Sequence, residues 1–408
     1  MKKIEVIFGA WGERWLLGTL ADNGTHLLFE YSAEALRRGI EFSPRNVKLR
    51  AEAYRDFPHH QHQLPGLIAD ALPDGWGMLL MDRLIAQMGL DKRQISPLDR
   101  LAILGDRTMG AFTFQPAMGE MLKPTEMSLL NLANEVRQEI SGHASDALKE
   151  LMLIGGSPHG ARPKALVQYD LATAQVSTLD EAPGSPWLIK FQAQNEHKEV
   201  CAIEDVYAVM ARACLLDMPK THYFDLDSTT SGFGIERFDR QNGQRIPIHT
   251  LAGFLNVDFR IPSVDYETLL RATTFLTQSE RELEKAFERC VFNVIFHNRD
   301  DHAKNFSFRM NEQMHWELAP CYDLTFNEGP GGEHQMDIRG EGRAPCKKHL
   351  IDLAANNGLK VAWANQVIER MTQVAGTFSE QVANHAIRTQ TCQLISRTIE
   401  ANRARMLD

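Results

Sequence analysis

Three side chains in the last third of the sequence have the types and spacing that phosphoryl transfer requires. Asp300 and Asn305 lie five residues apart in the stretch NRDDHAKNFSF, and Asp323 follows 23 residues after Asp300. Transfer of a phosphate to a hydroxyl needs a carboxylate that accepts or orients the hydroxyl proton. It also needs an amide and a second carboxylate that hold Mg²⁺ against the phosphates. We therefore expect Asp300 to act as the base, and Asn305 and Asp323 to hold the metal.

Protein kinases use the same order: an aspartate, an asparagine five residues later, a hairpin, and then a metal-binding aspartate. Two other interpretations of the stretch remain open. An acid-rich loop can simply cap a helix and stay solvated. A metal hydrolase could instead use Asp300, His302 and Asp323 as ligands, although no second His or Glu stands at helical ligand spacing to complete such a site.

A kinase also needs a phosphate cradle and a lysine. IGGSPHGARPK has three glycines between positions 155 and 160, and without a Cβ they let backbone N–H groups approach phosphate oxygens. The stretch matches neither common glycine-rich phosphate motif, so a flexible surface turn remains an alternative. Lys164 ends this loop, and Lys190 lies in the apolar run WLIKF, before a helical segment with Glu204. We expect Lys190 to pair with Glu204, although the helix dipole alone also favours a glutamate in a first helical turn.

The elements that must position these residues follow from local patterns. Residues 279–297 are predicted to form a helix that begins with a capping box of Ser279 and Glu282. FSF and HWEL are predicted strands around Asn311-Glu312, so the acid-rich stretch is a loop between a helix and a hairpin. Residues 203–216 have the apolar spacing of a helix, and GFGIERFDRQNGQRIPIHT predicts two strands joined by an Asn-Gly turn.

The N-terminal part has a different pattern. WLLGTLADNGTHLLFEY predicts a hairpin around Asp22-Asn23-Gly24, and LPDGWGMLLMDRLIAQMGL predicts a helical segment after the strands. A proline-marked connection follows, then a β-rich part with one helix, and from 262 on the pattern is mostly helical. We expect three parts, at 1–120, 121–260 and 261–408.

Composition limits the class of protein. The 408 residues are 43% hydrophobic and carry a formal net charge of -9, which argues against strong nucleic-acid binding by this chain alone, because duplex-binding domains carry a basic footprint. The six cysteines form no CxxC pair, as is typical of reduced thiols. No stretch approaches the roughly 18 apolar residues of a membrane span. We therefore expect a soluble, cytoplasmic protein without membrane contact.

Together these motifs resemble the HipA-type serine/threonine kinases of bacterial type II toxin–antitoxin modules. WGERWLLGTL and LPDGWGMLLMDR are similar to that family's N-terminal subdomain, GGSPHGARPKAL to its glycine-rich loop, PWLIKF to its lysine strand and IERFDR to its hinge. RDDHAKNFSF and YDL are similar to its catalytic and metal-binding segments. The resemblance covers nearly the whole chain. It implies an α+β, two-lobed protein-kinase-like fold with a small N-terminal β-rich subdomain and an all-helical C-terminal lobe.

The resemblance also implies a role for each matched position. Asp300 would be the catalytic base, and Asn305 and Asp323 would hold magnesium. Autophosphorylation would fall on Ser157, where a phosphate of about -1.5 to -2 charge would disfavour ATP, although a serine there also suits a plain turn. The nucleotide would be bound by residues of the loop, the lysine strand and its helix partner, the hinge and the catalytic segments: His159, Gly160, Ala161, Arg162, Pro163, Lys164, Lys190, Glu204, Glu236, Arg237, Phe238, His302, Ala303, Lys304 and Tyr322.

The implied cofactors are ATP and Mg²⁺. The implied partners are a small helix-turn-helix antitoxin protein and a protein substrate in translation, such as an aminoacyl-tRNA synthetase, with DNA contacted only through the antitoxin. Two alternatives stay open. One is a small-molecule phosphotransferase of kinase-like fold, and the other is a non-catalytic corepressor scaffold for a DNA-binding antitoxin.

Two positions depart from the family pattern. Asp301 stands where some members have glycine, and it would either raise the pKa of Asp300 or point to solvent. Pro158-His159 makes the glycine loop stiffer and bulkier than a loop of small residues. Neither change removes a group that the chemistry requires.

Overall fold

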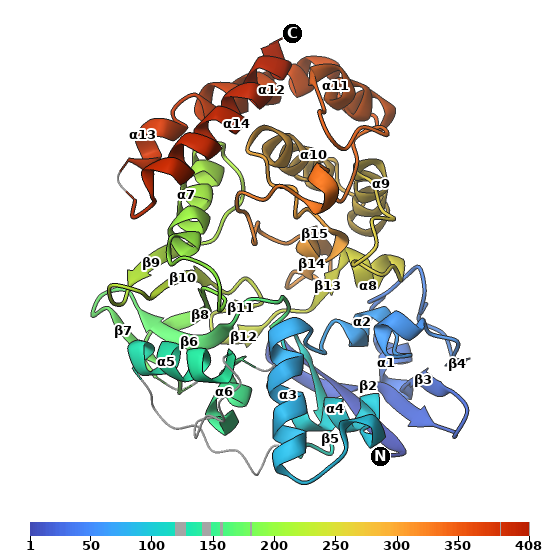
Figure 1. Cartoon of the computed structure of the whole chain (residues 1–408). Helices are drawn as coiled ribbons and strands as arrows, with labels where there is room; N and C mark the ends of the chain where they lie inside the picture. The colour runs from blue at the N-terminus through green and yellow to red at the C-terminus, as the bar shows by residue number, and fades with distance from the viewer. Residues whose placement is uncertain (119–127, 141–147, 156–157, 180–181, 384, 408) are drawn as a thin grey trace.

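The computed structural model describes residues 1–118, 128–140, 148–155, 158–179, 182–383 and 385–407. Helices and sheets are mixed along the chain. Figure 1 places the two larger sheets toward one end of the molecule and the C-terminal helices toward the other. No helix in these ranges is both long enough and apolar enough to cross a bilayer.

The first sheet is antiparallel, with strand order β4-β3-β2-β1-β5. The predicted hairpin at 22–24 is confirmed: it joins β2 to β3, and the Asp22 carboxylate accepts a hydrogen bond from Gly24 N (2.7 Å). The predicted helix in LPDGWGMLLMDRLIAQMGL is α3. The elements of this part are β1 (Lys3–Ala10), β2 (Glu13–Asp22), β3 (Leu27–Tyr31), α1 (Ala33–Arg38), β4 (Ala53–Tyr54), α2 (Gly66–Ala69), α3 (Gly75–Gln87), α4 (Pro97–Leu104) and β5 (Phe112–Gln115).

The second sheet has the order β7-β6-β8-β10-β9, which puts β8 with Lys190 in its centre. The predicted helix at 203–216 is α7, which begins and ends a few residues earlier and packs against β9 and β10 (Figure 1). The elements are α5 (Leu129–Ile140), α6 (Leu148–Gly155), β6 (Lys164–Asp170), β7 (Gln175–Ser177), β8 (Ser185–Phe191), α7 (Glu199–Ala213), β9 (Thr221–Asp225) and β10 (Ser231–Glu236).

The remaining part is mainly helical, but it is not all-helical as the resemblance implied. The predicted strands FSF and HWEL are confirmed as β14 and β15, which form a small sheet in the order β13-β14-β15, with the cross-strand partners Phe308 and Leu318 both buried in the core. The elements are β11 (Arg240–Gln241), β12 (Gln244–Arg245), β13 (Ile248–Thr250), α8 (Leu251–Leu255), α9 (Tyr266–Thr277), α10 (Glu280–Ile295), β14 (Ser307–Met310), β15 (Trp316–Leu318), α11 (Lys347–Asn356), α12 (Val361–Ala375), α13 (Phe378–Val382) and α14 (Thr389–Leu407).

The predicted capping box at the start of α10 forms on the Ser279 side only. Ser279 caps the helix by accepting from Glu282 N (3.4 Å), as predicted. The Glu282 carboxylate does not complete the box, because it accepts instead from Leu318 N (2.8 Å) and from Lys285 Nζ (2.9 Å). The buried glutamate thus ties α10 to the hairpin that follows the acid-rich loop.

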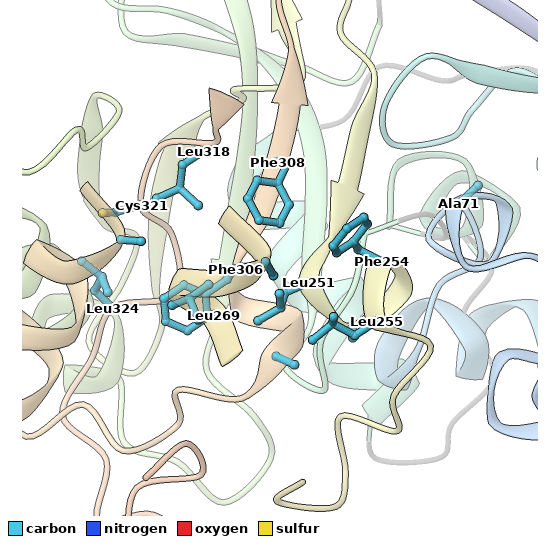
Figure 2. Close-up of a cluster of buried hydrophobic side chains, with 14 of the residues drawn as sticks. Ala71, Leu251, Phe254, Leu255, Leu269, Phe306, Phe308, Leu318, Cys321 and Leu324 are labelled. Carbon is cyan, nitrogen blue, oxygen red and sulfur yellow. The ribbon is translucent and has the colours of Figure 1, made fainter. Parts of the chain in front are cut away.

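Buried apolar side chains hold the end of that loop. Figure 2 shows Leu251, Phe254 and Leu255 of α8 gathered near Phe306 and Phe308, which lie just after the loop. Burial of each such side chain stabilises the folded state by about 1.5–3 kcal/mol. One buried cluster continues through all three predicted parts of the chain, so the division at 120 and 260 stays a prediction.

Candidate active site

A cavity of about 660 Å³ gathers most of the predicted site residues. Its walls come from the glycine-containing loop, β8, the end of β10 with the hinge after it, the acid-rich loop, and the YDL segment. The predicted residues among its lining are His159, Gly160, Ala161, Arg162, Lys164, Lys190, Glu236, Arg237, Phe238, Asp300, His302, Lys304, Asn305, Tyr322 and Asp323.

Three predicted residues of the described ranges are not part of this lining. Glu204 is buried behind Lys190 and contacts it directly. Pro163 meets β8 through its carbonyl, which accepts from Phe191 N (2.9 Å), and Ala303 is buried with 4% of its surface exposed. Ser157, the predicted autophosphorylation site, lies outside the described residues. Glu204 therefore acts on the cavity only through the lysine it holds.

Asp300 sits at the edge of the cavity with one carboxylate oxygen already held. Gln335 Nε2 donates to Asp300 Oδ1 (2.9 Å), and Asn305 Nδ2 donates to the backbone carbonyl of Asp300 (2.7 Å). The second bond occupies the Asn305 nitrogen, which leaves its oxygen as the atom to offer to a cation. Burial raises the pKa of Asp300; His302 opposes this shift, while the charge of Asp323 adds to it.

Lys190 joins the second sheet to the YDL segment. Its ammonium forms ion pairs with both Glu204 and Asp323, so the predicted Lys190–Glu204 pair is confirmed. Burial opposes charge on Lys190, but the two carboxylates outweigh it and raise the pKa of the lysine. Burial likewise opposes charge on Asp323, yet Lys190 and Lys164 hold the pKa of this carboxyl well below its usual range. Lys190 stays protonated and Asp323 ionised at neutral pH.

The loop that covers the cavity is tied down from both sides. Lys164 Nζ donates to the carbonyl of His159, and Gly160 N donates to Asp74. Gly160 has a φ of 105°, which a residue with a Cβ rarely adopts. Burial lowers the pKa of His159 to about 4, so its imidazole is neutral, and its Nε2 bonds to the carbonyl of Leu72 (3.0 Å).

Asp74 was not predicted as a site residue. Besides Gly160 it holds Lys304, whose Nζ lies 2.7 Å from Asp74 Oδ2 and 4.8 Å from the centre of the Phe259 ring. Burial opposes its charge, but His159, which is protonated in the acid range where Asp74 titrates, and Lys304 keep the pKa of Asp74 well below its usual range. The motif LPDGWG was visible in the sequence, but nothing local connected its aspartate with a loop far along the chain.

The hinge presents backbone and an aromatic face. Glu236 N donates to the carbonyl of Lys220 and Arg237 N to that of Pro186, both at 2.9 Å. These two amides are occupied, whereas the carbonyl of Glu236 and the amide of Phe238 have no backbone partner among the described residues and are available to a ligand. The Phe238 ring stacks on Tyr322 at 5.3 Å, which gives the cavity an apolar wall beside the hinge.

Asp301 turns inward, so the prediction that it points to solvent is wrong. Its carboxylate accepts from Tyr266 Oη (2.8 Å), His334 Nδ1 (2.7 Å) and Gln335 N (2.8 Å). Three donors satisfy this buried acid, which explains why the interior tolerates it. Its charge adds to the rise in the pKa of Asp300, as the other prediction stated.

The donor set bears on the alternative of a metal hydrolase. Across the described ranges, no three His, Cys, Asp or Glu side chains are grouped so that they could hold a metal ion by themselves. Asn305 and Asp323 offer hard oxygen ligands of the kind that Mg²⁺ takes when substrate phosphates complete its coordination. These residues fit a magnesium ion carried by a nucleotide.

Comparison with known proteins gives the family. The HipA N-terminal domain matches residues 9–115, and the HipA-like C-terminal domain matches residues 156–378, more than half of the chain. The chain belongs to the HipA family. A solved HipA, from Shewanella oneidensis MR-1 in a toxin–antitoxin complex with HipB and operator DNA, has the same fold, with a TM-score of 0.73 and 18% sequence identity. That match covers 98% of this chain and 96% of the Shewanella chain.

Two further matches of this HipA-family chain cover less of it. A "putative kinase" of Haemophilus influenzae is 27% identical over 158 residues, which is 35% of this chain and 43% of the relative. The match thus spans less than half the length of that relative. The Helicobacter pylori proinflammatory kinase CtkA has a TM-score of 0.42 and 11% identity, over 56% of this chain and 90% of that one, which is too low to support an argument.

Proposed function

We propose that this HipA-family protein is an ATP- and Mg²⁺-dependent serine/threonine protein kinase. The observation that carries the proposal is the ammonium of Lys190, held between Glu204 and Asp323. In active protein kinases, a strand lysine pairs with a helix glutamate, and a second aspartate binds the metal. Asp300 and Asn305 line the same cavity, so the groups that phosphoryl transfer requires face one space.

The side chains have separate tasks in this proposal. Asp300 accepts the proton of the acceptor hydroxyl, and its raised pKa makes it a better proton acceptor than an ordinary aspartate. Asn305 and Asp323 hold Mg²⁺, which when bound neutralises charge on the phosphates. Lys190 contacts the phosphates while Glu204 fixes its position.

The rest of the cavity suits the nucleotide. The backbone of the loop between His159 and Lys164 covers the phosphates, and Arg162 is oriented by three hydrogen bonds to Glu196 (2.7, 3.1 and 3.1 Å). Adenine meets the hinge through the carbonyl of Glu236 and the amide of Phe238. The apolar wall beside the hinge supplies stacking surface.

The proposed biological role follows the family. The protein acts as the toxin of a type II toxin–antitoxin pair, and a helix-turn-helix antitoxin is its partner. The Shewanella HipA structure contains HipB and operator DNA, which supports this pairing. The net charge of -9 supports DNA contact through the antitoxin only. The substrate is a translation component such as an aminoacyl-tRNA synthetase, and Ser157 is the autophosphorylation site.

Asp300→Asn and Asp323→Asn test the proposal directly. Each variant should lower transfer of labelled γ-phosphate from ATP by about 10²–10⁴-fold, because a positioned base contributes that much and a lost metal ligand no less. Asp352→Asn, at an exposed position on α11, is the matched control and should keep wild-type activity. Full transfer by either active-site variant contradicts the kinase assignment.

The same reaction identifies the residue that accepts the phosphate. With ATP as the only small molecule, mass spectrometry should find the phosphate on Ser157, and Ser157→Ala should remove it. Nucleotide binding without any transfer would favour a corepressor scaffold instead. Phosphoproteomics after expression of wild type and of Asp300→Asn should then identify the protein substrate as phosphorylated only by the wild type.

A further inference from the structure

Gln335 is a polar residue at the active site to which neither a motif nor the family match assigns a role. It lies in the segment after YDL, 12 residues beyond Asp323, yet its Nε2 donates to Asp300 Oδ1 (2.9 Å). A carboxylate has two oxygens, and this bond occupies one of them. Among the described residues no donor bonds to the other oxygen, Oδ2, which is therefore available to face an acceptor hydroxyl.

The segment that carries Gln335 is bound to the acid-rich loop at several points. Arg299, next to Asp300, donates through Nη1 to the carbonyl of Gly332 (2.7 Å) and through Nη2 to that of Arg343 (2.5 Å). Arg299 is buried, with 7% of its surface exposed. Its guanidinium therefore holds both ends of the segment against the loop.

Asp301 completes the attachment on the other side of Asp300. It accepts from the ring of His334 (2.7 Å) and from the backbone amide of Gln335 (2.8 Å), and both Asp301 and His334 are almost fully buried. A charge-assisted bond to the backbone of Gln335 leaves that residue little freedom to shift. The family departure at 301 is thus the anchor of the segment.

We propose that Gln335 is a positioning residue that orients the carboxylate of Asp300. Asp301 and His334 hold Gln335 in place. This inference rests on the proposed kinase function. Arg299, Asp301 and Gln335 form one unit around Asp300: two of them fix the segment and the third contacts the base. Loss of a group that orients the catalytic base should lower kcat. It should leave the KM for ATP unchanged, because the nucleotide still binds when the carboxylate is misoriented.

Gln335→Met tests this assignment, since methionine keeps the length of the side chain and removes the N–H donor. We expect kcat for phosphoryl transfer to fall about 10-fold to 100-fold, the worth of a hydrogen bond to a charged group. The KM for ATP should stay within about twofold, because Gln335 contacts Asp300 rather than the nucleotide. Gln335→Ala should also lower kcat and leave the KM for ATP unchanged. Gln313→Ala, the same substitution at an exposed position near β14, should alter neither constant.

A double variant tests whether Asp301 holds Gln335 in place. Asp301→Asn should lower kcat by at least as much as Gln335→Met, and the two changes together should lower it no further than Asp301→Asn alone, because they remove one unit. Wild-type kcat in Gln335→Met, or a raised KM with kcat unchanged, would overturn the inference. Wild-type enzyme is assayed first: if it transfers no phosphate, the proposed function itself fails, and this inference with it.

Discussion

Lys164 is a charged side chain in an almost fully buried position, with 3% of its surface exposed beside the phosphate loop. Burial lowers its pKa to about 8, although Asp323 opposes the shift. Below pH 8 the ammonium is charged and suited to phosphate, and above pH 8 the amine is neutral. The affinity for a non-hydrolysable ATP analogue should therefore fall as pH rises from 7 to 9, by about tenfold at most.

Calorimetric titration at several pH values measures this dependence. Lys164→Met is the control variant: it should bind the analogue more weakly at pH 7 and lose the dependence between pH 7 and 9. If wild type and Lys164→Met show parallel pH profiles, another group titrates in this range and the role of Lys164 is wrong.

Single residues of the site were predictable where partners are close in sequence. Lys190 and Glu204 are only 14 residues apart, near the end of β8 and within α7, and the kinase order of a lysine strand followed by a helix suggested the pair. Asp74 is 86 residues from Gly160 and 230 from Lys304, and no local pattern links such distant positions. Gln335 was missed for a related reason: the sequence gives no sign that its segment folds back onto Asp300.

At the scale of elements, the end of α7 carries an unfavourable residue. Leu215 has a φ of 64°, a conformation that favours glycine, and 69% of its surface is exposed. Leu215→Gly should relieve the strain and raise the free energy of unfolding by about 1 kcal/mol, because the leucine has little burial to lose. Thermal unfolding checks the change, and phosphoryl transfer should stay the same.

Leu215→Ala separates backbone strain from the loss of the side chain. Alanine keeps the Cβ that conflicts with the left-handed conformation, so this variant should gain almost nothing. Equal stabilisation by alanine and glycine would mean that the exposed leucine, rather than the backbone, is the unfavourable feature.

Elements with a strong local signal were predicted well, and those set by tertiary contacts were not. The Asp22-Asn23-Gly24 and Asn242-Gly243 turns lie where the sequence placed them, because their residues favour tight hairpin turns. The capping box at Ser279 failed on one side, since a buried backbone amide of β15 competes for the same carboxylate. The implied all-helical lobe is wrong because β14 and β15, which the local pattern did predict, lie within it; what no local pattern indicated is that β14 also pairs with β13.

At the scale of the whole molecule, the N-terminal part is joined to the catalytic part by a buried polar contact. Asp70, at the end of α2, accepts from His249 Nδ1 (2.7 Å), Thr250 N (2.8 Å) and Thr250 Oγ1 (2.7 Å). Asp74, four residues after Asp70, accepts a hydrogen bond from Gly160 N in the glycine-containing loop. Any shift of α2 against β13 and α8 should therefore reach the nucleotide site.

Gly66 is where that joint can be tested, because α2 and α8 approach each other backbone to backbone. A Cβ on Gly66 would lie 2.7 Å from the carbonyl carbon of Gly253, closer than packed atoms allow. Gly66→Ala should lower the free energy of unfolding by about 3 kcal/mol, the upper part of the range for overpacking, because backbone cannot rotate away as a side chain can. It should also weaken nucleotide binding, measured by calorimetry on the folded variant.

Gly9→Ala, whose Cβ would have its nearest neighbour at 3.8 Å, is the control and should change neither the free energy of unfolding nor the nucleotide affinity much. Loss of stability with unchanged nucleotide affinity would mean that the two parts are joined mechanically but that α2 does not position Asp74.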